Sequence, residues 1–207
     1  MYFEYFIRIF HWLCRSVSVS NWIEITKILG ASLAFSIGLW QYRKSEAWKR
    51  LEFVAAEMKI FYDDVAVKAA MAMLDWRKKE MTLFKYRGEN DYSRVVVDYE
   101  IVADSLSINP DSQYGKTQSA IREIFERFLE FLARFEGFLE AGVVKQSDLN
   151  PYLDYWMKLI SGRDSHSSEA TEQVLPQLWK FIDYYGYRDV RRFVGRYHNV
   201  VFPEFID

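Results

Sequence analysis

The sequence predicts a mainly α-helical protein, with one membrane-spanning helix near the N-terminus followed by a bundle-like helical domain that includes one short β-hairpin. An uncharged apolar run covers residues 28–40, and apolar residues recur at helical spacing over residues 117–141. The chain has only four prolines and nine glycines in 207 residues. Half of the residues are hydrophobic and 27% are charged, which argues against disorder and against a wholly membrane-embedded protein.

The apolar run, ILGASLAFSIGLW at residues 28–40, is too short to span a bilayer by itself. Extending it to Trp22 and Tyr42 gives about 20 residues, the length that crosses roughly 30 Å of hydrocarbon. Trp22, Trp40 and Tyr42 then lie at the two ends, where interfacial aromatic residues are common. The alternative is a buried core helix of a soluble protein.

The charges beside the span predict its orientation. Basic residues follow it more densely than they precede it: Arg43, Lys44, Lys49 and Arg50 against Arg8, Arg15 and Lys27. By the positive-inside rule, the C-terminal side lies in the cytoplasm. The single cysteine, Cys14, excludes an internal disulfide and fits a reducing compartment.

Three small residues, Gly30, Ala34 and Gly38, recur every fourth position within the span and share one helix face. Small residues at this spacing let two helices approach closely in lipid. We therefore expect membrane-helix packing through this face and a homo-oligomer. The alternative is coincidence, because small residues are common in membrane helices.

The first segment, residues 2–15, has apolar residues at helical spacing and a narrow polar stripe formed by Glu4, Arg8, His11 and Arg15. One interpretation is an amphipathic helix that lies in the membrane interface. A second is a hairpin wall whose stripe faces other subunits and lines a conduit. A third is a signal peptide, although the charges interrupt the apolar region that such a peptide needs.

These patterns divide the chain into an N-terminal helix at residues 1–20, a membrane helix with a basic flank at 21–47 and a cytosolic domain at 48–207. Neither glycine nor proline separates the span from residues 41–63, so one helix is expected to continue through them. We expect further helices at residues 65–74, 117–141, 150–161, 175–185 and 188–197. A hairpin is expected from residues 81–83 and 95–97, with loops at 105–116 and 163–168.

Several short motifs occur along the predicted domain. They are Trp48-Lys49-Arg50, Glu52-Phe53-Val54-Ala55, Leu74-Asp75-Trp76, Ile121-Arg122, Phe128-Leu129, Arg134-Phe135-Glu136, Gly142 and Pro151-Tyr152-Leu153-x-Tyr155-Trp156. Together they resemble a family of uncharacterised bacterial proteins that have one N-terminal span and a helical cytosolic domain. The resemblance covers roughly residues 30–197 and supplies no active site. It implies the bacterial inner membrane as the location.

The sequence contains no recognisable catalytic or cofactor motif. His11, His166 and His198 are scattered, so neither a metal site nor another cofactor is expected. Phosphate-binding loops, dinucleotide-binding glycine motifs and nucleophile elbows are absent. Asp63 and Asp64 are expected to be a solvated helix end rather than a catalytic pair. A net charge of −2 and a pI near 6 do not favour a nucleic-acid partner.

A basic cluster lies near the C-terminus, on the predicted helix at residues 188–197. Its members are Arg188, Arg191, Arg192 and Arg196. Four guanidinium groups could hold a phosphate-bearing ligand, because their geometry matches that of phosphate. The alternative is a solvated face that makes surface ion pairs with glutamates.

We therefore expect a non-enzymatic, membrane-tethered interaction or signalling protein that self-associates and binds a partner protein. A membrane-perturbing or pore-forming effector, whose cytosolic domain senses a ligand or partner, is the second hypothesis. The third is an enzyme acting on a phosphorylated substrate, which rests on the basic cluster alone.

Overall fold

The computed structural model describes residues 19–83, 94–109, 113–162 and 168–197 of the chain. Seven helices and one two-stranded sheet lie in these residues, which confirms the mainly α-helical fold. By its internal contacts the chain divides into two compact units, residues 1–49 and 50–207.

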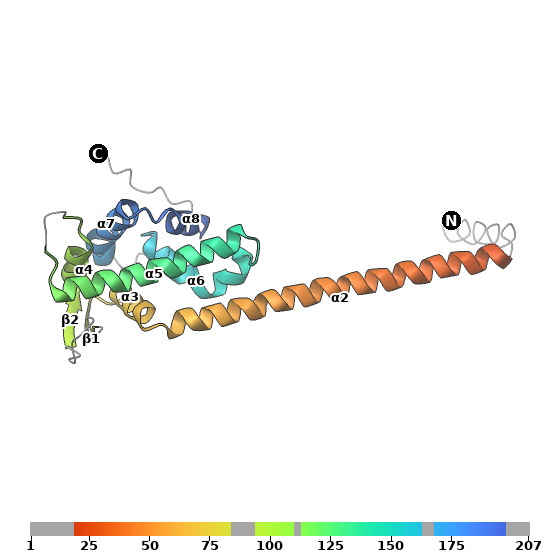
Figure 1. Cartoon of the computed structure of the whole chain (residues 1–207), viewed down its shortest axis with the longest axis horizontal. Coiled ribbons are helices and arrows are strands. Elements are labelled where there is room, and N and C mark those ends of the chain that lie inside the picture. The colour runs from red at the N-terminus through yellow and green to blue at the C-terminus, as the bar shows by residue number, and fades with distance from the viewer. Residues whose placement is uncertain (1–18, 84–93, 110–112, 163–167, 198–207) are drawn as a thin grey trace, which may run out of the picture. The chain divides into compact units, whose positions relative to one another are not determined.

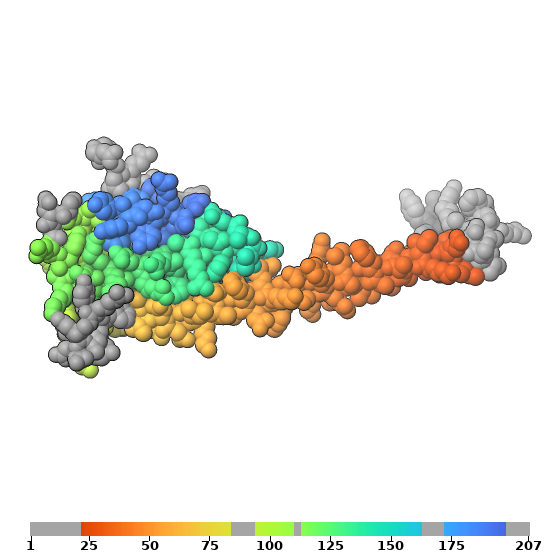
Figure 2. Space-filling model, in the orientation of Figure 1, coloured from red at the N-terminus to blue at the C-terminus, as the bar shows by residue number. Residues whose placement is uncertain are grey.

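The first described helix, α2, runs from Val19 to Asp63 (Figure 1). It confirms that the helix continues past the apolar run without a break. From Trp22 onward it is long and apolar enough to cross a membrane, with a mean hydropathy of 1.4 over its most apolar 18 residues. None of these residues is buried inside the described structure, as Figure 2 also shows from one side. A core helix of a soluble protein would be mostly buried, so this observation does not support that alternative.

The second unit is a helical domain that contains one small hairpin (Figure 1). Its helices after α2 are α3 (Val65–Asp75), α4 (Tyr99–Leu106), α5 (Lys116–Glu140), α6 (Gln146–Ile160), α7 (Ser168–Tyr184) and α8 (Arg188–Tyr197). Its strands are β1 (Lys78–Thr82) and β2 (Arg94–Asp98), which pair antiparallel with Lys78 opposite Asp98. The hairpin is thus confirmed, whereas its turn lies outside the described residues.

Helix α5 is the centre of the domain and contacts α3, α4 and α8. Its predicted apolar stripe is buried, as expected for an amphipathic helix whose apolar face covers a core. The ring of Phe61, from the last turns of α2, lies 6.1 Å from that of Phe128 and 5.3 Å from that of Phe135, measured between centroids. This aromatic cluster joins the end of α2 to α5.

Two predicted helix starts are wrong, and both errors involve a proline. The helix expected to start at residue 150, directly before Pro151, is α6, which instead begins at Gln146 and contains Pro151. Similarly, α7 begins at Ser168 rather than at residue 175 and contains Pro176. In both helices, buried apolar residues lie on either side of the proline, so tertiary packing offsets the lost hydrogen bond.

Helix α4 was not predicted, and its last residues lie in the expected loop at 105–116. It begins after Asp98, whose side chain accepts a hydrogen bond from the amide of Ile101 at 3.0 Å. The helix ends expected at residues 141 and 185 are confirmed to within one residue, because α5 ends at Glu140 and α7 at Tyr184. Gly142 and Gly186 have φ of 67° and 72°, a conformation that glycine adopts without strain after a helix.

Candidate functional site

The four arginines of the predicted basic cluster all lie on α8, but they do not form one site. Arg188, Arg191 and Arg192 line a hollow of about 670 Å³ together with Asp189 and Gly195. Arg196 turns towards α5 instead, and its Nε and Nη2 each donate to the carboxylate of Glu136 at 2.7 Å. The structure therefore separates Arg196 from the other three.

Carboxylates already neutralise much of the positive charge at this hollow. Arg191 pairs with Asp183 at 2.8 Å. Arg192 pairs with Asp189 at 2.5 Å and with Glu140 at 2.6 Å. These ion pairs support the solvated-face interpretation of the cluster more than they support a phosphate site, because an anion would have to displace the carboxylates.

The small residues of the span lie on an open face of α2. A Cβ atom added at Gly30 or Gly38 would meet no atom within 4 Å, and Ala34 is exposed. The face is therefore accessible to another helix.

The polar stripe of Glu4, Arg8, His11 and Arg15 lies outside the described residues, as do all three histidines. Within the described part of the chain, no group of three or more His, Cys, Asp or Glu side chains is arranged to hold a metal ion.

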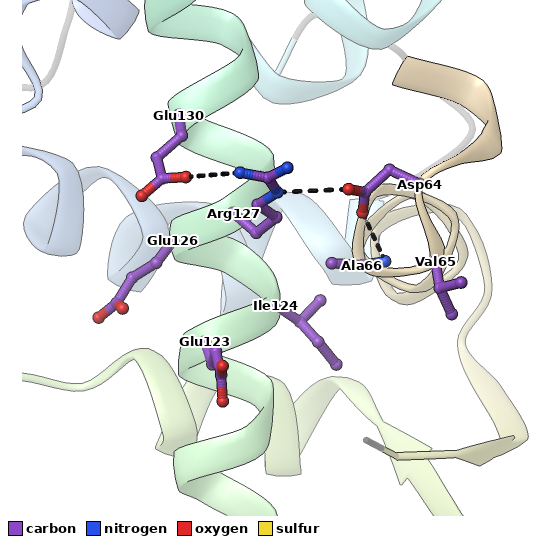
Figure 3. A pocket seen from close by; sticks show the side chains of 8 residues that line it. All are labelled: Asp64, Val65, Ala66, Glu123, Ile124, Glu126, Arg127 and Glu130. Carbon is purple, nitrogen blue, oxygen red and sulfur yellow. Dashed lines mark hydrogen bonds and ion pairs between the residues drawn. The ribbon is translucent and has the colours of Figure 1, made fainter. Parts of the chain in front are cut away.

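A groove between the start of α3 and one face of α5 is a further candidate site, which sequence reasoning did not find (Figure 3). It has a volume of about 570 Å³. It is lined by Asp64, Val65, Ala66, Glu123, Ile124, Glu126, Arg127 and Glu130. It combines four carboxylates and one guanidinium with three apolar side chains.

Asp64 is the single residue between α2 and α3, and its two carboxylate oxygens have different partners. One oxygen accepts hydrogen bonds from the amides of Ala66 at 2.8 Å and Val67 at 3.2 Å, and thereby caps α3. The other accepts from Nε of Arg127 at 3.3 Å. Asp64 is therefore a structured cap rather than the solvated end that the sequence suggested, although its neighbour Asp63 is exposed.

Arg127 projects from α5 into the groove and is held between two carboxylates (Figure 3). Besides its bond to Asp64, its Nη1 donates to Glu130 at 3.2 Å. The hydrogen bond to Asp64 is the main cause that raises the pKa of Arg127. The guanidinium also lies 4.8 Å from the centroid of the Phe131 ring. It nevertheless remains half exposed to solvent.

The other two carboxylates of the groove, those of Glu123 and Glu126, form no salt bridge among the described residues, although the positive charge of Arg122 acts on Glu126. Glu126 is partly buried, and this burial raises its pKa because it disfavours the charged form. Ile124 and Ala66 form buried parts of the apolar lining, whereas 61% of Val65 is exposed. Spacing along α5 could have grouped its charged residues, but only packing brings Asp64 to them.

Arg122, which belongs to the Ile121-Arg122 motif but was not expected to form a site, is buried. Its Nη1 donates to the carbonyl oxygens of Ser105 at 2.8 Å and Ser107 at 3.2 Å. Its Nη2 donates to the hydroxyl of Tyr185 at 2.7 Å, and the ring centroid of Tyr114 lies 4.1 Å from the guanidinium carbon. Arg122 thus satisfies carbonyl groups at the end of α4, which indicates a structural role.

Comparison with known proteins gave no match to any family model, to any curated protein or to any solved structure. The resemblance to the uncharacterised bacterial family therefore stays a prediction, and the function must be inferred from the chain itself.

Proposed function

We propose that the chain is a non-catalytic interaction protein, tethered to the bacterial inner membrane by residues 22–42 and self-associating. In this proposal the second unit lies in the cytoplasm and presents binding surfaces to a partner. The observation that carries the proposal is that no residue in the apolar part of α2 is buried.

The exposed apolar side chains surround this part of the helix rather than forming one stripe. They include Ile28, Leu29, Leu33, Phe35, Ile37, Leu39 and Trp40, with exposed fractions of 42–73%. Removing one such side chain from water is worth about 1.5–3 kcal/mol. A helix that is apolar on all sides therefore requires a cover, and lipid covers every face at once.

The C-terminal end of the apolar run has the chemistry of a membrane interface. Nζ of Lys44 lies 5.4 Å from the centroid of the Trp40 ring. Tryptophan and lysine are both suited to the headgroup region, where the ring stays half in lipid and the amine reaches water. The basic residues from Arg43 onward support the cytoplasmic placement of the second unit.

The tether is tested by fractionating cells that express the full-length chain. We expect the protein in the membrane pellet, resistant to high salt and alkaline carbonate. Replacing Leu33 and Phe35 with lysine should move it to the soluble fraction, since each charge near the middle of a span costs about 2.5–3.5 kcal/mol. Full-length chain that is soluble without detergent would overturn the proposal.

The domain boundary and the orientation need separate measurements. Residues 48–207 alone should be soluble, helical and cooperatively folded, and a fragment without a thermal transition would show that the boundary is wrong. A C-terminal reporter that is active only in the cytoplasm should be active on the full-length chain. An inactive reporter on membrane-bound protein would reverse the orientation and leave the tether intact.

A further inference from the structure

We propose that the groove between α3 and α5 docks a cationic segment of a partner protein, through lysine or arginine side chains on its carboxylates and an apolar side chain on its floor. The inference rests on the proposed function, because it names the chemistry of the partner that an interaction protein would bind.

The chain itself shows that the groove holds a guanidinium group. The side chain of Arg127 enters it and is bound by Asp64 from the α2–α3 junction and by Glu130 from α5, at 3.3 Å and 3.2 Å (Figure 3). The two carboxylates come from different elements, so the fold creates this arrangement and a single helix does not. Arg127 thus occupies part of the groove in the way that a partner's cation would.

The groove has more negative charge than Arg127 can neutralise. Its lining contains four carboxylates and one guanidinium, which leaves a formal charge of −3. Glu123 and Glu126 also line the groove, and neither forms a salt bridge among the described residues. A second cation can therefore bind here without displacing any existing pair. Electrostatic complementarity of this kind favours association with a basic partner and rejects an acidic one.

The apolar lining distinguishes a protein segment from a simple cation. Val65 is an apolar residue that is 61% exposed, and it lines the groove together with Ala66 and the α5 residue Ile124. An inorganic ion or polyamine would leave this apolar surface in water. A peptide segment with basic side chains and one small aliphatic side chain can satisfy both the carboxylates and the floor.

Arg127 acts as an internal competitor in this arrangement. A cation can bind Glu123 and Glu126 while Arg127 stays in place, but it reaches Asp64 and Glu130 as well only when Arg127 swings away. Half of the Arg127 side chain is already exposed to solvent. Removal of its charge should therefore strengthen docking. A merely structural role for Arg127 predicts no such gain.

The test measures fluorescence anisotropy of a labelled nine-residue peptide with three arginines, one valine and five alanines, added to full-length protein in a non-ionic detergent. Empty micelles and a peptide with glutamate in place of arginine serve as controls. We expect Arg127→Gln to tighten binding about two- to fivefold, and Glu123→Gln with Glu126→Gln to weaken it at least about threefold. Binding of the arginine peptide should fall as salt is added.

A matched double variant removes two acidic charges elsewhere, by Glu52→Gln with Glu100→Gln, at exposed positions outside the groove. This variant should change the dissociation constant less than twofold. The inference is overturned if the two double variants weaken peptide binding equally. It is also overturned if Arg127→Gln does not tighten peptide binding although the circular dichroism of the protein is unchanged. Membrane fractionation of the same variants reports separately on the tether, so the two proposals can fail independently.

Discussion

Arg196 and Glu136 join α8 to α5 through two parallel hydrogen bonds of 2.7 Å each. The carboxylate of Glu136 is fully buried, whereas 40% of the Arg196 side chain is exposed. The pair lies beside the apolar contact that α8 makes through Val190, Phe193 and Val194, all of which are fully buried. Arg196 therefore supplies the charge that allows a carboxylate to remain inside the domain.

Loss of Arg196 alone should destabilise the domain strongly. Arg196→Met leaves the Glu136 carboxylate buried without its partner, and breaking such a pair costs about 3–5 kcal/mol. We expect the lower end of this range, because water can reach the arginine side of the pair. Urea unfolding of residues 48–207, followed by circular dichroism, measures the change.

The double variant Glu136→Gln with Arg196→Met is the control for this prediction. It removes both charges, so it should recover much of the stability that Arg196→Met loses. Arg192→Met, which removes the exposed ion pairs of an α8 arginine with Asp189 and Glu140, should change stability little. A double variant as unstable as Arg196→Met would show that the arginine contributes by packing and not by charge compensation.

Phe128 should be one of the most sensitive core positions. It is fully buried on α5 and its ring packs against that of Phe61 from α2. Phe128→Ala should lower the free energy of unfolding of residues 48–207 by about 3–5 kcal/mol, because it leaves a cavity. Tyr184→Ala, at a position that is 61% exposed, is the aromatic control and should have a small effect. An equally small effect of Phe128→Ala would place that face of α5 outside the core.

Glu126 should make stability depend on pH. Burial raises its pKa above the ordinary 4.5, so the folded state holds its proton more tightly than the unfolded state does. The stability that this difference supplies is complete below pH 4.5 and is lost as the pH rises through the raised pKa. Glu126→Gln should therefore be more stable than the wild-type chain at pH 7, with a smaller difference at pH 4.

Thermal unfolding of residues 48–207 at the two pH values measures this effect. Glu123→Gln removes the same charge three residues away at an exposed position and should give a smaller gain at pH 7. The quantity to compare is the gain in stability of Glu126→Gln over the wild-type chain at each pH. A gain that is smaller at pH 7 than at pH 4 would contradict the direction of the pKa shift.

The small residues of the span should govern self-association. Replacing Gly30, Ala34 and Gly38 with leucine blocks close helix approach and should reduce the oligomer of the full-length chain in detergent. Leucine at the exposed positions Ser32 and Ser36 is a control that keeps the small-residue face. Light scattering or cross-linking measures the size. An oligomer unaffected by the triple change would place assembly in the second unit.

The effector hypothesis depends on Arg8, which lies outside the described residues. A charge near the bilayer centre costs at least about 2.5–3.5 kcal/mol, so a pore-lining Arg8 must be solvated by water or paired with Glu4 of a neighbour. Arg8→Leu should then abolish dye leakage from cells that overproduce the chain, and Arg8→Glu should change ion preference. If the first segment lies in the interface, permeability should stay at background in every variant.

The sequence by itself determined the elements whose pattern is local. The apolar stripe of α5 repeats at the helical period over residues 117–141, and the structure buries it against the core. The bounds of α8 and the helix ends at Gly142 and Gly186 also depend on neighbouring residues alone, and all were predicted. The hairpin followed from its β-branched residues.

Only the tertiary structure decided which charges meet and which prolines lie inside helices. Asp64 meets Arg127, and Glu136 meets Arg196, across sequence separations of 63 and 60 residues. No spacing rule reaches that far, because such pairs form only after α3, α5 and α8 pack together. Pro151 lies within a helix for a related reason: burial of apolar residues on both sides of it outweighs the local preference for a helix start.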